Sequence, residues 1–128
     1  MCDDPNYLAR LLYARVMSAH ETVGAPIEPF GEFAAGEWEL THLGTDGVIG
    51  FKLCPEKDGD SVIVALPTNH SPAASRRVVR LIWGRVRTGR KVYSAAWKNH
   101  TLAVNINVRM GARALGETPD GYFHFVYE

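Results

Sequence analysis

The residues with the clearest capacity for chemistry lie where a short polar segment runs into a basic one. Ser71 and Pro72 suit the start of a helix, and arginines follow at positions 76, 77 and 80. A helix start offers unpaired N–H groups and the positive end of the helix dipole, which together attract anions. We therefore predict a phosphate site formed by Asn69, His70, Ser71, Arg76, Arg77 and Arg80. The alternative is a capped surface helix with solvated arginines, because the glycines of known phosphate-binding loops are absent.

A second set of polar residues would share one face of a hairpin predicted over residues 90–97 and 102–109. A turn at 98–101 would place Trp97 opposite Leu102 on an apolar face. The other face would carry Arg90, Ser94, Asn105, Asn107 and Arg109. Asparagine is disfavoured inside strands, so the arginines and asparagines of this face are predicted to contact a ligand. The alternative is a sheet face that is simply exposed to water.

Catalytic residues are not evident. The five histidines, at positions 20, 42, 70, 100 and 124, show neither metal-binding spacing nor the pattern of a known phosphoesterase. No Ser-centred elbow supports a triad, and neither Cys2 nor Cys54 has the context of a nucleophile. We therefore expect no catalytic residue, no metal and no cofactor.

The zero net charge conceals an uneven distribution of charge. Residues 1–70 carry eleven acidic and four basic side chains, whereas residues 71–128 carry ten basic and three acidic ones. Such asymmetry suggests either binding of a polyanion or complementary association of surfaces. Alternatively, the two halves interleave in the fold and neutralise each other.

Hydrophobic periodicity and turn residues predict the elements of an α+β fold. A helix is expected from Pro5 to about residue 23, followed by an ordered loop over 25–35. Three short strands, 37–43, 48–54 and 61–66, should form an antiparallel meander. A helix over 71–86 and strands over 90–97, 102–109 and 122–127 complete the order α-β-β-β-α-β-β-β. We predict a single α+β domain over 1–128, with an antiparallel sheet packed against two helices.

Composition limits the class of protein. The chain has 128 residues, of which 46% are hydrophobic and 22% charged, as in ordinary globular proteins. It contains no apolar run of membrane-spanning length and no signal peptide, so we expect a cytoplasmic protein. The excess of arginine over lysine and the lack of glutamine suggest a bacterial or phage origin.

These features together predict a small non-catalytic protein that binds a phosphorylated ligand, either a nucleic acid or a nucleotide. By analogy of fold alone, the order α-β-β-β-α is that of double-stranded-RNA-binding domains. The alternative function is a protein-binding factor or inhibitor that uses its acidic and basic surfaces. The strand 122–127 has aromatic residues on both faces, which predicts either a central strand or a homo-oligomer interface.

Overall fold

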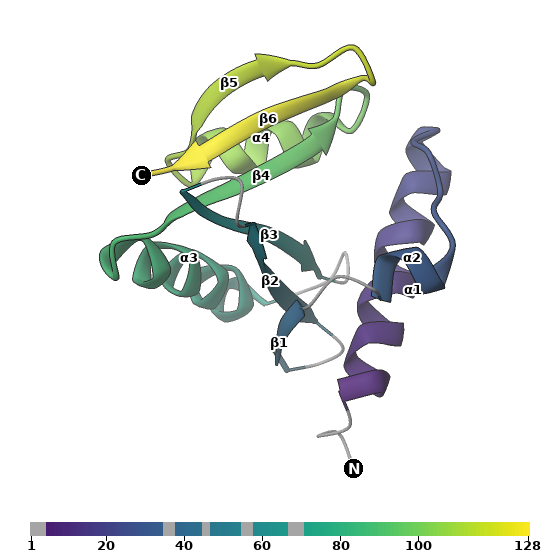
Figure 1. Ribbon diagram of the computed structural model, residues 1–128, viewed down its shortest axis with the longest axis horizontal. Helices are drawn as coiled ribbons and strands as arrows, with labels where there is room; N and C mark the ends of the chain where they lie inside the picture. The colour runs from purple at the N-terminus through teal and green to yellow at the C-terminus, as the bar shows by residue number, and fades with distance from the viewer. Residues whose placement is uncertain (1–4, 35–37, 45–46, 55–57, 67–70) are drawn as a thin grey trace.

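Six strands form one sheet in the order β1-β2-β3-β4-β6-β5 in the computed structural model (Figure 1). The structure describes residues 5–34, 38–44, 47–54, 58–66 and 71–128. The helices are α1 (Pro5–Val23), α2 (Phe30–Ala34), α3 (Pro72–Arg87) and α4 (Thr101–Arg109). The strands are β1 (Trp38–His42), β2 (Val48–Cys54), β3 (Gly59–Ala65), β4 (Lys91–Trp97), β5 (Arg113–Glu117) and β6 (Tyr122–Tyr127). Every neighbouring pair is antiparallel except β3 and β4, so the predicted α+β class is confirmed.

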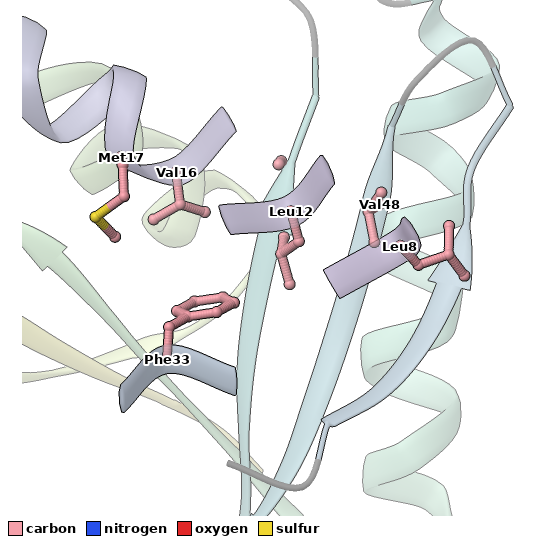
Figure 2. Close-up of a cluster of buried hydrophobic side chains, with 7 residues drawn as sticks. Leu8, Leu12, Val16, Met17, Phe33 and Val48 are labelled. Carbon is pink, nitrogen blue, oxygen red and sulfur yellow. The ribbon is translucent and has the colours of Figure 1, made fainter. Parts of the chain in front are cut away.

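Helix α1 covers one face of the first three strands. Its apolar residues Leu8, Leu12 and Val16 recur at helical spacing and are buried against Val48 of β2 and Phe33 of α2 (Figure 2). Full burial of a leucine such as Leu12, which is 0% exposed, stabilises the fold by about 2 kcal/mol. The predicted helix and the predicted antiparallel meander β1-β2-β3 are both confirmed.

Helix α3 packs on the opposite face of the sheet. Ser71 caps the helix by accepting a hydrogen bond from the N–H of Ala74, and Pro72 follows at the first helical position. Val78 and Ile82 are buried in a cluster that includes Phe51 of β2. The predicted helix over 71–86 is therefore confirmed, with its apolar face on the sheet.

The predicted hairpin of residues 90–97 and 102–109 is wrong, because the second segment is the helix α4. Trp97 pairs with Tyr122 of β6 and not with Leu102. The side chain of Asn107, which a hairpin would expose, is buried and bonds to Tyr127 of β6. Burial of this contact outweighs the strand preference of the valines and isoleucine in the segment.

The C-terminal region also differs from the prediction. Residues 113–117, where no strand was predicted, form the edge strand β5, and the expected loop over 25–35 contains α2. Strand β6 lies between β4 and β5, so its aromatic residues on both faces belong to an interior strand. The described residues form four helices that flank the sheet, where two were expected, with α1 and α2 apart from α3 and α4 (Figure 1). The homo-oligomer stays a prediction. Among the described helices, none is long and apolar enough to cross a membrane.

Candidate functional site

The sheet opens between its two parallel strands. Strands β3 and β4 pair over three residues only, from Gly59 opposite Lys91 to Ser61 opposite Tyr93. Beyond that point residues 62–65 and 94–97 do not pair with each other, and the strands diverge toward their carboxyl ends (Figure 1). The inner edges of both strands therefore carry backbone N–H and C=O groups without a strand partner. Open α/β sheets bind ligands at the carboxyl ends of such parallel strands.

Two histidines lie close enough to interact electrostatically, and one of them follows β4 in the chain. His20, in the last turn of α1, is 2.9 Å from the carbonyl oxygen of Pro26 through Nδ1. Since a carbonyl can only accept, Nδ1 carries a proton and donates it in this hydrogen bond. His100 follows the carboxyl end of β4 and stands at the N-cap position of α4. Burial, and secondly the nearby charge of His20, lower the pKa of His100 below its usual 6.5, so this imidazole is neutral at pH 7.

An aromatic pair borders the same end of the sheet. The rings of Trp97, the last residue of β4, and Tyr122, the first of β6, meet edge to face with centroids 5.2 Å apart. Burial, and secondly the charges of Asp120 and Glu28, raise the pKa of Tyr122, so its hydroxyl keeps its proton. Trp97 Nε1 is buried and has no hydrogen-bond partner among the described residues. An unpaired buried donor costs about 1–3 kcal/mol, which an acceptor on a ligand would recover.

The described residues of the predicted phosphate site cap the start of α3 or lie within it. Ser71 Oγ accepts from the Ala74 N–H at 3.3 Å. Arg76, Arg77 and Arg80 are exposed, and none forms an ion pair with a described residue. Asn69 and His70 lie outside the described residues. The phosphate site stays a prediction.

The residues of the predicted hairpin face are not brought together. Arg90 directly precedes β4 and binds Asp60 through Nη2 at 3.0 Å. Asn105 and Arg109 are exposed on α4. Asn107 donates from Nδ2 to the carbonyl of Ala103 at 2.9 Å and accepts from the Tyr127 hydroxyl at 2.8 Å. The hairpin face itself is absent, because the segment with the alternating pattern is a helix, and a role of these residues in ligand binding stays a prediction.

Part of the charge asymmetry is neutralised inside the fold. Arg85 of α3 binds Glu39 of β1 through both terminal nitrogens and binds Asp60 of β3 through Nε at 2.9 Å. Arg90 binds the same Asp60, whose carboxylate is almost fully buried. These contacts join acidic residues of the first half to basic residues of the second, as the interleaving alternative proposed.

Sequence reasoning did not connect His100, Trp97 and Tyr122, which the fold brings to one end of the sheet. The spacing of these three residues in the sequence matches no known motif. A usable signal was the order of strand, polar segment and helix around His100, because ligand sites commonly follow the carboxyl ends of strands.

Solved structures similar to this chain are acetyltransferases. An acetyltransferase from Thermus thermophilus is 16% identical, with a TM-score of 0.65 over 93% of this chain and 89% of that one. A GNAT-family acetyltransferase from Bacillus anthracis is 10% identical, with a TM-score of 0.58 over 93% and 86% of the two chains. The ribosomal-protein-S18-alanine N-acetyltransferase from Escherichia coli is 13% identical, with a TM-score of 0.55 over 91% and 84%.

At these identities the likeness concerns the fold, which is GNAT-like. No family model matches the sequence, and no curated protein does. The likeness nevertheless contradicts the expected non-catalytic binding protein, whether for RNA, a nucleotide or a protein partner, because the fold is one that acetyl-transferring enzymes use. The analogy to double-stranded-RNA-binding domains fails for the same reason.

Proposed function

We propose that this chain is an acetyltransferase that moves an acetyl group from acetyl-coenzyme A to an amine. The observation that carries the proposal is the opening between β3 and β4, where pairing ends after Ser61 and Tyr93. The fold likeness to acetyltransferases supports the class of reaction. One of these neighbours is by name an N-acetyltransferase acting on alanine, and an amine is accordingly the acceptor proposed here.

The opening suits the shape and chemistry of coenzyme A. The pantetheine arm is a narrow chain with two amides, and it needs backbone donors and acceptors along its length. Residues 62–65 and 94–97 offer such groups on the two diverging edges. The diphosphate would lie at the start of α3, where the helix dipole and the exposed guanidinium groups of Arg76 and Arg77 favour negative charge.

The side chains at the carboxyl end of β4 can handle the protons of this reaction. A bound thioester supplies an acetyl carbonyl that is activated toward attack by nitrogen. His100, neutral at pH 7, accepts the proton that the amine loses as the C–N bond forms. The Tyr122 hydroxyl donates a proton to the sulfur as the C–S bond breaks. Trp97 Nε1 donates a hydrogen bond to the carbonyl oxygen, since this buried N–H has no acceptor among the described residues.

The test is calorimetric titration with acetyl-coenzyme A, together with release of free thiol in the presence of amines. Ala95 is exposed on the part of β4 that does not pair with β3, so Ala95→Phe should fill the opening and abolish binding without disturbing the core. The matched control is Ala114→Phe, at an exposed position of β5, which should bind normally. Equal binding by Ala95→Phe and the control, or no binding by the unmodified protein, would contradict the proposal.

The diphosphate contact is tested separately. Arg77→Ala should weaken binding of acetyl-coenzyme A about tenfold, the effect of one lost charge-assisted contact. The same variant should bind acetyl-pantetheine as the unmodified protein does, because that donor lacks the diphosphate. If both donors lose affinity equally, Arg77 acts on the fold and not on the phosphates.

A further inference from the structure

A groove of about 560 Å³ lies between α3 and the outer strands β1 and β2. Its α3 wall is formed by Arg80, Leu81, Gly84 and Arg85, and Thr88 follows the end of that helix. The floor includes Phe51 and Leu53, and Glu39 and Thr41 lie on the far wall. The groove runs along the later turns of α3, near the paired start of β3 and β4, whereas the proposed acetyl-transfer site lies at the opposite, divergent end.

The charged residues that the structure describes in the groove include one cation without an ion pair. Glu39 is bound by both terminal nitrogens of Arg85, at 3.2 and 2.7 Å. Asp60 is bound by Arg85 at 2.9 Å and by Arg90 at 3.0 Å. Both carboxylates are therefore neutralised within the protein. Arg80 is exposed, lines the groove and forms no ion pair with any residue the structure describes.

Next to this cation the groove is apolar. Leu53 is 58% exposed, and Leu81 and Phe51 border the same space. The Arg85 guanidinium lies over the Phe51 ring at 4.3 Å, so one edge of the floor is held rigid by a charged group that is already paired. A ligand here would meet the positive charge of Arg80 and an apolar surface together.

Gly84 is an independent sign that this space is kept open. It lies in the interior of α3, where glycine is unfavourable compared with alanine. A Cβ at this position would meet nothing within 4 Å outside the neighbouring turns, so no contact with a described residue requires a glycine. The missing side chain instead lets a molecule in the groove approach the helix backbone closely.

We propose that this groove binds an apolar carboxylate, with its carboxylate on Arg80 and its apolar body against Leu53, Leu81 and the backbone at Gly84. A single guanidinium fork matches a planar, singly charged carboxylate. The carboxylate belongs either to a free small acid or to the C-terminus of a polypeptide, since both present the same group.

Calorimetric titration with phenylacetate tests the site. We expect saturable binding, and binding at least about tenfold weaker for acetate, which lacks the apolar body, and for phenylacetamide, which lacks the charge. Arg80→Ala should lose phenylacetate binding, while Arg77→Ala, an exposed arginine of the same helix outside the groove, should keep it. Gly84→Phe should fill the groove and abolish binding.

Three results would overturn the proposal: no saturable binding of phenylacetate up to about 10 mM, unchanged binding by Arg80→Ala, or unchanged binding by a folded Gly84→Phe variant. If Gly84→Phe does not fold, the comparison of Arg80→Ala with Arg77→Ala decides. A pentapeptide ending in phenylalanine, with a free or an amidated C-terminus, distinguishes the two sources. Tighter binding of the free form than of phenylacetate identifies a polypeptide C-terminus, and failure of both forms identifies a small acid.

Discussion

The Tyr127 hydroxyl and the Asn107 amide form a buried hydrogen-bonded pair. Tyr127 is 0% exposed, and its hydroxyl donates to Asn107 Oδ1 at 2.8 Å. The Tyr127 ring also meets Trp83 of α3 edge to face, with centroids 5.6 Å apart. This one side chain thus links β6 to both α3 and α4. Burial raises the pKa of Tyr127 to about 12.

Tyr127→Phe should lower the free energy of unfolding by about 1–2 kcal/mol at pH 7, because it leaves the buried Asn107 oxygen without a donor. The pH dependence should change as well. An unfolded tyrosine ionises near pH 10, and the folded one near 12, so the stability that Tyr127 contributes is complete below pH 10 and is lost as pH rises to about 12.

Chemical denaturation between pH 7 and about 11 measures both effects. The Phe variant should lose less stability at alkaline pH than the unmodified protein. Parallel alkaline curves would show that Tyr127 ionises normally in the folded state.

The pH dependence of activity can be predicted from His100. Its pKa is lowered from 6.5 by burial and by His20, so a base at this position is active at pH 7 and loses activity only at more acidic pH. His100→Gln should reduce kcat about 10²–10⁴-fold and remove the acidic limb of the pH profile. His42→Gln, at the far edge strand β1, serves as the control and should keep both. An unchanged acidic limb in His100→Gln would assign that limb to another group.

Among the elements, α4 shows where sequence patterns mislead. Apolar residues alternate at positions 102, 104, 106 and 108, and they are mostly β-branched, which is typical of a strand. The contrary signal was Gly111, which ends the helix with φ +97°. The N–H of Gly111 bonds to Val108 O and that of Ala112 to Asn107 O, the pattern of a glycine-ended helix. By contrast, β2 was predictable from the alternation of its apolar residues. Helix α3 was predictable because its helical periodicity and its capping residues agreed.

Two glycines allow the same substitution to be tested with opposite expected signs. Gly111→Ala should destabilise the protein by about 1–2 kcal/mol, since φ +97° is strained for alanine and the new Cβ would lie 3.2 Å from the Trp83 ring. Gly84→Ala should stabilise it by about 0.5–1 kcal/mol, because the position is helical and open. Thermal unfolding of the two variants side by side is the measurement. Stabilisation by Gly111→Ala would refute this account of the end of α4, and destabilisation by Gly84→Ala would refute the account of an open position in α3.

At the scale of the whole molecule, the proposed acetyl-transfer site is a product of topology and not of a motif. Its walls are the unpaired backbone edges of β3 and β4, and no side-chain motif in the sequence marks those edges. Pairing of β3 with β4 was not predictable from sequence, because the expected partner of β4 was the segment that forms α4. The basic residues of α3, by contrast, could be recognised from local sequence.

Gly59 permits the close approach of the two parallel strands. A Cβ at Gly59 would lie 2.1 Å from the backbone carbonyl oxygen of Lys91, too near for either strand to keep its place. Gly59→Ala should destabilise the protein by about 2–4 kcal/mol, in the range of severe backbone clashes. Denaturant titration provides the value, with Gly31→Ala, a helical position where a Cβ meets nothing within 4 Å, as the control that should not be destabilised. Equal midpoints for the two variants would show that the strands can separate without cost.

The short parallel contact between β3 and β4 also bears on the order in which the chain folds. The meander β1-β2-β3 and the hairpin β5-β6 are each built from nearby segments, whereas β4 pairs with both β3 and β6 across long stretches of the sequence. Contacts between distant segments pay a larger loop-closure cost, so the meander and the hairpin should form first and β4 should join them afterwards. Substitutions at Gly59 should then accelerate unfolding and leave the refolding rate almost unchanged, with φ-values near zero, whereas substitutions at the β2–β3 contact should slow refolding.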